Sequence, residues 1–354
     1  MTVRAEKPSV NLREKLAELD KPTGIAGEAM LRAETPQEQQ ALIGVGRRNF
    51  IINGLAQVSQ RGDYTSATSM TVNNYYIDRW KAYSSGGTNT IQQVTSSQPS
   101  SLAGSKSIKI LSSSGGTIAL GASQIIEDYQ FFVGKELTVS GWIKSTNPNA
   151  RFLVSDNAAW NAVGDAHSGS GDWEFITGTI TLSASATGLT LSPRISTSSA
   201  GAVSVSANDY IEFTGVQLEL GKVATPFEHR SYGEELALCQ RYFWQITGSA
   251  SDQTTFGNGY SEDTNSAQVT LFFPVEMRDV PSTTIGTGVG EASVEIIGYG
   301  VAASASLAAI LDPSKLSVRG RFNADSGTPF TGGHAIVGRL TASSSAYIWV
   351  DAEL

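Results

Sequence analysis

Apolar and polar residues alternate along many short stretches of this chain, which is the pattern of β-strands rather than of helices. In the segment 138–144, small or apolar residues occupy every second position, so one face of that strand is expected to be buried. The segment 210–220 has the same period, with a slip at Gly215 that predicts a β-bulge. Many short strands separated by Gly, Ser and Asn turns predict two antiparallel sheets packed as a sandwich over residues 48–230.

The strands expected in this sandwich are 49–52, 55–58, 107–111, 116–120, 137–144, 151–154, 174–182, 190–195 and 210–220. The segment 124–132 is also interpreted as a strand. After residue 230, Ser231 and Glu234 have the spacing of a capping box and predict a short helix. Further strands are expected at 241–247, 268–273, 293–297, 315–322, 335–340 and 347–353, so residues 231–354 are predicted to form that helix and a smaller C-terminal β-domain.

Residues 1–47 differ from the rest, because acidic and basic residues balance there and the whole excess of −8 lies in the remainder. Asn11 and Thr35 are candidate N-caps of two short helices, and Pro36 suits the first helical position. Helices of this length are marginal in water on their own. We therefore expect an N-terminal helical segment that anchors the chain to other proteins, with a disordered tail as the alternative.

The composition excludes several classes of function. Charged residues make up 16% of the chain and its pI is about 5.0, so no nucleic-acid partner is expected, since phosphate binding needs clustered Lys and Arg. The single cysteine, Cys239, allows no intrachain disulfide. The N-terminus has no apolar signal-peptide region, and no apolar run reaches 18 residues, so neither a signal peptide nor membrane insertion is expected.

No residue pattern predicts catalysis, a metal or a cofactor. The histidines His167, His229 and His334 are scattered and lack metal-ligand spacing. Adjacent residues in the stretch 164–168 cannot form a Ser-His-Asp triad, which assembles distant segments. Neighbouring carboxylates such as Glu234 and Glu235 are better explained by helix capping. We therefore expect a protein that is not an enzyme.

Aromatic residues in polar surroundings are the better candidates for ligand binding, because sugar rings pack on flat aromatic faces. Trp160 is predicted to lie in a loop and to stack on a sugar, and its polar companions would be Asp156, Asn157 and Asn161. A second aromatic loop is predicted over 256–260, with candidate ligand-binding residues Phe256 and Tyr260. Trp80 and Trp142 are assigned to the core.

Several passages carry a resemblance to a known family. The sequences GVQLELGKVATPFEHRSYGEELALCQRYF (215–243), RNFIINGLAQVSQRGDY (48–64) and YYIDRW (75–80) resemble strands of the jelly-roll carbohydrate-binding modules of phage tail fibres and other virion appendages. FFPVEMRDVPSTT (272–284) and YIWVDAEL (347–354) resemble the β-domain that follows this module. The resemblance implies a mainly β protein with a jelly-roll β-sandwich over 48–230.

The resemblance also implies a function. It predicts a virion appendage similar to a tail fibre, a homotrimer that joins other virion proteins through residues 1–47 and recognises host surface glycans. Such a protein is located in the virion after assembly in the host cytoplasm. Two alternatives remain: a purely structural head fibre or decoration protein without a ligand, and a non-catalytic glycan-binding module of a glycan-degrading enzyme.

Overall fold

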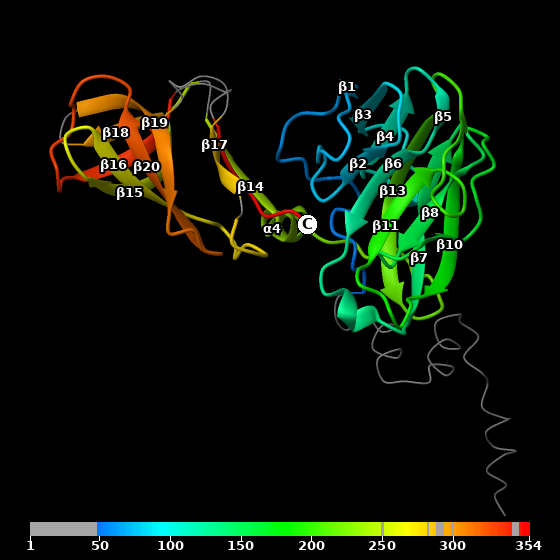
Figure 1. Cartoon of the computed structure of the whole chain (residues 1–354). Helices are drawn as coiled ribbons and strands as arrows, with labels where there is room; N and C mark the ends of the chain where they lie inside the picture. The colour runs from blue at the N-terminus through cyan, green and yellow to red at the C-terminus, as the bar shows by residue number, and fades with distance from the viewer. Residues whose placement is uncertain (1–47, 249–250, 282, 288–293, 299–300, 342–346) are drawn as a thin grey trace, which may run out of the picture.

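The computed structural model describes residues 48–248, 251–281, 283–287, 294–298, 301–341 and 347–354. Over these residues the protein is mainly β, as predicted (Figure 1). The two helices predicted within 1–47 lie outside the described residues. None of the described helices is long and apolar enough to cross a membrane.

Two antiparallel sheets form the first β unit (Figure 1). The six-stranded sheet has the order β1-β3-β4-β13-β7-β10, with bounds Thr68–Ser69, Asn89–Val94, Ser107–Ser112, Tyr210–Leu220, Glu136–Ser145 and Trp173–Thr181. The five-stranded sheet has the order β2-β6-β11-β8-β9, with bounds Lys81–Ser84, Leu120–Ile125, Thr190–Ile195, Ala150–Ser155 and Trp160–Val163. A small ribbon pairs β12 (Val203–Val205) with β5 (Gly116–Ile118). The predicted segment 124–132 ends its strand at Ile125, and a 3₁₀ turn, η2, follows over Tyr129–Phe132.

The inward faces of the two sheets share one apolar core. Its centre includes Trp80, which is 1% exposed and meets the ring of Phe213 edge-on at 5.0 Å between centroids. The Trp80 indole N–H also donates to the carbonyl of Asn53 at 3.0 Å, so its polar atom is satisfied. Trp80 is therefore a core residue, as predicted. Trp142 is not, because it lies on the outer face of the six-stranded sheet and packs against the half-exposed Phe175.

The β-bulge predicted in the long strand is confirmed. The register of β13 against β7 shifts between Thr214 and Gln217, and Gly215 has a φ of 62°. That value lies in the left-handed region, where glycine carries no steric penalty. A Cβ at this position would also come within 2.4 Å of a Leu102 side-chain carbon.

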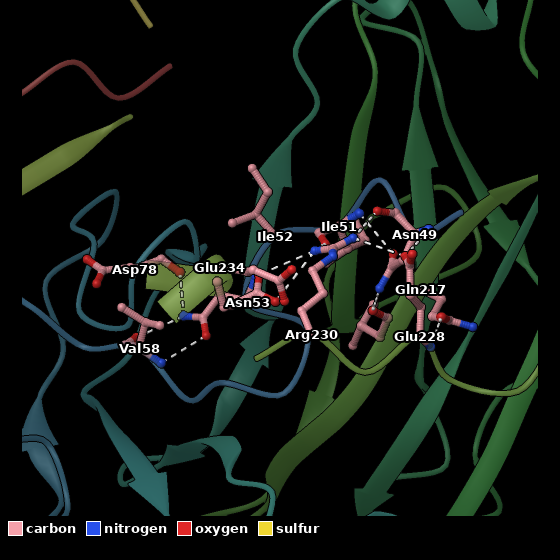
Figure 2. A network of polar contacts seen from close by, with 12 residues as sticks. Asn49, Ile51, Ile52, Asn53, Val58, Asp78, Gln217, Glu228, Arg230 and Glu234 are labelled. Atoms are coloured by element: carbon pink, nitrogen blue, oxygen red, sulfur yellow. Dashed lines mark hydrogen bonds and ion pairs between the residues drawn. The ribbon is translucent and has the colours of Figure 1, made fainter. Parts of the chain in front are cut away.

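The two strands predicted at 49–52 and 55–58 are not formed. Side chains provide many of the hydrogen bonds of this segment (Figure 2), beside isolated backbone bonds such as that from the Phe50 N–H to the Leu218 carbonyl. The Asn49 carboxamide accepts from the backbone of Ile51 and donates to the carbonyl of Val216. The Asn53 carboxamide accepts from the Val58 N–H and donates to its carbonyl. Because these amides satisfy the backbone, no ladder with a neighbouring strand is needed.

Arg230, which lies at the C-terminal end of the first β unit in the sequence, also holds the segment 49–58 in place (Figure 2). Its guanidinium donates to the carbonyls of Asn49 and Ile51 and pairs with Glu228 and Glu235. The helix α4, Tyr232–Gln240, follows directly, and its Ser231–Glu234 capping box is present in both directions, as predicted. Its cap therefore lies against the beginning of the first β unit.

The second β unit contains a three-stranded sheet and a closed barrel (Figure 1). The sheet has the order β14-β22-β17, with bounds Phe243–Thr247, Tyr347–Asp351 and Thr283–Thr287. The barrel has the order β15-β16-β20-β19-β18-β21, with bounds Thr254–Ser261, Ser266–Phe272, Ser317–Ala324, Val301–Leu311, Val294–Gly298 and Ala335–Leu340. The six strands predicted beyond residue 240 are all present, and residues 301–310, to which the sequence assigns no element, also form a strand.

The two β units meet beside α4, where the C-terminal residues also lie (Figure 1). Arg61 of the first unit pairs with Asp78 at 2.9 Å, Asp351 at 3.2 Å and Glu353 at 3.4 Å. Arg79, whose side chain is 2% exposed, also pairs with Glu353. The junction is thus made by buried charged groups contributed by both units.

Candidate functional site

Trp160 lies on a strand and not in a loop. Residues 150–163 form a hairpin of β8 and β9, in which Ser155 pairs with Trp160. The predicted loop is therefore wrong for Trp160, although the tight turn before it remains. Side chains alternate between the two faces of a strand, and Val163 belongs to the core. Trp160 accordingly projects from the outer face of the five-stranded sheet.

Two aromatic rings flank an arginine on this face. The Arg194 guanidinium carbon lies 3.8 Å from the centre of the Tyr83 ring and 4.7 Å from the centre of the Trp160 ring. These distances are within the range of cation–π contacts. We call this set, Tyr83, Arg194 and Trp160, the aromatic–arginine cluster. Tyr83 and Trp160 are each partly exposed, so part of each ring faces solvent.

The register of the sheet explains how the cluster forms. Tyr83 pairs with Gly121, and Gly121 pairs with Arg194, so the three residues share one row across β2, β6 and β11. Gly121 has no side chain, which lets the Arg194 side chain cross β6 to reach the tyrosine ring. In the next row of the sheet, Ser192 on β11 pairs with Leu153 on β8, and both residues are 0% exposed. Their burial is the result expected if the Arg194 guanidinium and the Trp160 indole lie above them.

Burial determines the electrostatics of the cluster. Arg194 is 3% exposed, and its Nε donates to the Ser192 hydroxyl at 3.1 Å. Desolvation lowers the pKa of Arg194 to about 10, and the nearby Tyr83 opposes this shift. Arg151 is the register partner of Arg194 on β8, and burial lowers its pKa as well. The Arg194 guanidinium remains charged at neutral pH, since a pKa of about 10 is well above 7.

The polar companions predicted for Trp160 do not join this cluster. Asp156 closes the β8–β9 turn by accepting from the N–H groups of Ala158 and Ala159. Those hydrogen bonds lower its pKa, first of all the one from Ala159. Asn157 occupies the left-handed region, with a φ of 71°, and donates to the carbonyl of Thr187 at 3.4 Å. Both residues are turn formers.

Asn161 also lies apart from Trp160. It follows Trp160 in β9, so its side chain points to the opposite face of the sheet. There it lines a hollow of about 320 Å³ together with Asp156 and Ser183. The structure therefore separates Trp160 from the three residues grouped with it in the sequence.

The second predicted aromatic loop, 256–260, is part of β15. Phe256 is 8% exposed and packs in the barrel core at 5.8 Å from the Phe322 ring. It presents no free ring face, so it is a core residue rather than a stacking platform. Tyr260 is 41% exposed on the outside of the barrel, and its hydroxyl donates to Gln268. Four residues apart on a regular strand, the two aromatics would share a face, but the register of β15 shifts between Thr255 and Gly257, and they lie on opposite faces.

A larger hollow of about 600 Å³ lies at the junction of the two β units. Arg61, Lys106, Tyr232 and Tyr347 are among its lining residues. Its charged groups are already engaged, because Arg61 pairs with three carboxylates and Lys106 donates to the Gln93 carboxamide. The aromatic–arginine cluster is the stronger candidate site, since it combines partly exposed rings with a charge that no described carboxylate pairs.

Among the described residues, no group of three or more His, Cys, Asp and Glu side chains could hold a metal ion. His167 is 1% exposed; its Nδ1 accepts from Gly169, and its Nε2 lies 2.9 Å from the carbonyl oxygen of Asp172. Glu174 Oε1 also lies 3.6 Å from Nε2, so both ring nitrogens have neighbours within the fold.

Sequence reasoning missed Tyr83, Arg151 and Arg194. Each lies at an outward position of an alternating strand, and that alternation was the available signal. The sequence does not show which strands are neighbours, however, so it does not show that Tyr83 and Arg194 meet across Gly121.

No protein-family model matches the chain, and no curated protein matches it either. Solved structures that align with part of the chain include the enzymatically active domain of tailspike protein 4 of bacteriophage CBA120, at 16% identity, a TM-score of 0.32 and coverage of 49% of this chain and 21% of that one. A CBM22 xylan-binding domain from Paenibacillus barcinonensis aligns at 15% identity, a TM-score of 0.29 and coverage of 46% and 99%.

A third structure is a CBM61 module in complex with β-1,4-galactotriose, at 14% identity, a TM-score of 0.30 and coverage of 50% of this chain and 100% of that one. At these TM-scores the likenesses establish neither fold nor function for this chain. The case for the site rests on its own contacts.

Proposed function

We propose that this protein is a fibre-like component of a virion appendage that binds host surface glycans through the outer face of its five-stranded sheet. The observation that carries the proposal is the aromatic–arginine cluster, in which the partly exposed rings of Tyr83 and Trp160 flank Arg194. No catalytic step is part of the proposal.

The cluster has the chemistry that a sugar requires. The C–H faces of a sugar ring pack on aromatic faces, and Trp offers a large flat face at a small cost in conformational entropy. A guanidinium presents several N–H donors in a fixed fork, which suits neighbouring oxygens on one sugar. A sheet also holds these groups more rigidly than a loop would, so less ordering is lost on binding.

The proposed place in a virion is supported by the sequence passages quoted above, which resemble appendage proteins. In this proposal residues 1–47 attach the chain to other virion proteins, and three copies form the fibre. A purely structural fibre or decoration protein would share these features but would need no ligand. Binding to glycans is the property that separates the two alternatives.

The test compares aromatic residues on the two outer sheet faces. Trp160→Ala and Tyr83→Ala should each weaken binding to host cells or to a printed glycan panel by about 1–3 kcal/mol, which is roughly 5- to 150-fold. Trp142→Ala is the matched control, because Trp142 is a partly exposed tryptophan on the opposite outer face. It should bind as the wild type does.

Thermal melting of the same variants checks that the fold is intact. Trp160→Ala should lower the melting temperature no more than Trp142→Ala does. If Trp160→Ala and Tyr83→Ala bind as the wild type does, or if the wild type binds neither host cells nor any glycan, the proposed glycan site is wrong. A purely structural role is then the better explanation.

A further inference from the structure

The charges on the outer face of the five-stranded sheet carry an inference about the kind of glycan, and it rests on the function proposed above. Arg194 and Arg151 are register partners on neighbouring strands. Within the described part of the chain, neither has a carboxylate within ion-pair distance. Their hydrogen bonds are from Arg194 Nε to Ser192 and from Arg151 Nε to the carbonyl of Asn149 at 3.3 Å.

Most other arginines of the described chain are paired with a carboxylate, and Arg48, which donates to the Thr225 hydroxyl, is the exception. Those with a carboxylate oxygen within 4.0 Å are Arg61, Arg79, Arg230, Arg241, Arg278, Arg319, Arg321 and Arg339. This set includes Arg79, whose side chain is about as buried as Arg194. The fold therefore pairs its deeply buried Arg79 with an acid and leaves Arg194 without one.

The five-stranded sheet as a whole has basic side chains without acidic ones. The five strands have the sequences KAYS, LGASQI, TLSPRI, ARFLVS and WNAV, which contain Lys81, Arg151 and Arg194 and no acidic residue. The chain as a whole has a net charge of −8. The opposite six-stranded sheet carries both signs, with Glu136, Glu174, Glu212 and Glu219 beside its lysines. The positive face is thus local and runs against the overall charge.

A buried cation without a counter-ion is costly, because desolvation is not repaid by a partner. The rings of Tyr83 and Trp160 offset part of that cost through their π-faces. A second guanidinium on the adjacent strand raises the cost again by like-charge repulsion. A bound anion would relieve both, and a carboxylate fits the planar guanidinium fork with two parallel hydrogen bonds.

We propose that the glycan bound on this face is acidic, with a sugar carboxylate at Arg194 and Arg151 and the sugar ring against Trp160 or Tyr83. The ligand class is therefore a uronic acid, a sialic acid or another carboxylate-bearing sugar. Lys81 would contribute a third positive charge from the edge strand β2, which increases the attraction for a polyanionic chain.

The test measures binding of the full-length protein to matched pairs of oligosaccharides. The pairs are oligogalacturonate with its methyl ester, and sialyllactose with lactose, and sulfated lactose is a third arm that carries charge without a carboxylate. At least one carboxylate-bearing sugar should bind about 10- to 100-fold more tightly than its neutral partner, as expected for charge-assisted hydrogen bonds. Its binding should weaken as NaCl is raised, while neutral binding should not.

Two variants connect that preference to the arginines. Arg194→Gln and Arg151→Gln should each weaken binding of the acidic sugar at least about ten-fold more than binding of its neutral partner, so the acidic-over-neutral preference falls. A melting temperature close to that of the wild type shows that the face is folded. If Arg194→Gln does not fold, Arg151→Gln decides, since Arg151 is more exposed and carries less of the packing.

The outcomes separate this inference from the proposed function. If neutral and acidic partners bind equally, or if the arginine variants keep the preference, the acidic ligand is wrong while glycan binding stands. If sulfated lactose binds tightly and neither carboxylate pair shows a preference, the assignment to a carboxylate is wrong. If no sugar of either kind binds, the proposed function fails and the inference fails with it.

Discussion

The charged junction between the two β units gives a quantitative prediction, in which Glu353→Ala is the perturbation. The Glu353 side chain is 6% exposed and pairs with both Arg79 and Arg61. Arg61 keeps Asp78 at 2.9 Å and Asp351 at 3.2 Å when Glu353 is removed. The loss therefore falls mainly on Arg79.

Arg79 would then be a buried charge without a carboxylate. Its remaining contacts are a hydrogen bond to the Ile125 carbonyl at 2.8 Å and the Tyr242 ring, whose centre lies 3.5 Å from the guanidinium carbon. Removing one partner of a buried pair costs about 3–5 kcal/mol. A desolvated cation–π contact of about 2 kcal/mol remains in place and supports the lower end of that range. We expect a loss of about 3 kcal/mol.

The assay is urea unfolding followed by tryptophan fluorescence and circular dichroism. Both signals are needed because a chain with two β units does not have to unfold in one step. Asp312→Ala is the control, since Asp312 pairs with Arg319 at the surface and its side chain is 71% exposed. An exposed pair of that kind contributes about 0–1 kcal/mol.

A double-mutant cycle isolates the interaction. Arg79→Met combined with Glu353→Leu removes both charges and should recover much of the loss, because apolar replacements of a buried pair are often neutral. If Glu353→Ala is no more destabilising than Asp312→Ala, or if the two single effects simply add, the junction is not held by this pair.

Three further predictions follow from the structure and sequence. Trp80→Ala should destabilise the first β unit by about 3–5 kcal/mol, since it empties a core site, and urea denaturation would contradict this if the loss were below about 1 kcal/mol. Burial is the main cause that raises the pKa of Glu212, so the stability contributed by this carboxyl is present below its ordinary pKa and is lost as pH rises through the folded pKa. Glu212→Gln can still accept a hydrogen bond from Ser107, so between pH 4 and pH 7 its free energy of unfolding should rise relative to that of the wild type. A difference that is the same at both pH values would refute this assignment. Removal of residues 1–47 should leave a cooperative melt of residues 48–354 but abolish trimer formation and incorporation into particles. A full-length chain that light scattering shows to be a monomer, or a truncated chain that is still incorporated, would contradict the predicted role of that segment.

The sequence by itself determined the local elements of this protein. The alternation of apolar and polar residues located most of the long strands, because that pattern requires only that one face of the strand is buried. The Gly215 bulge and the Ser231–Glu234 cap were predicted correctly, since each depends on residues a few positions apart. The segment 49–58 was wrong because its bonds go to side chains such as Asn49 and Asn53, and an apolar stretch alone does not show which partner satisfies its backbone.

Only the tertiary structure decided the candidate site. The sequence singled out Trp160 as an aromatic in polar surroundings, and then grouped it with its neighbours in the chain. Strand alternation instead sends Asn161 to the other face, and the sheet order brings in Arg194 and Tyr83 from strands far away in sequence. An irregularity in β15, between Thr255 and Gly257, separates the buried Phe256 from the exposed Tyr260. Which residues share a face across a sheet depends on strand order and register, and both are set by long-range packing that a local pattern does not contain.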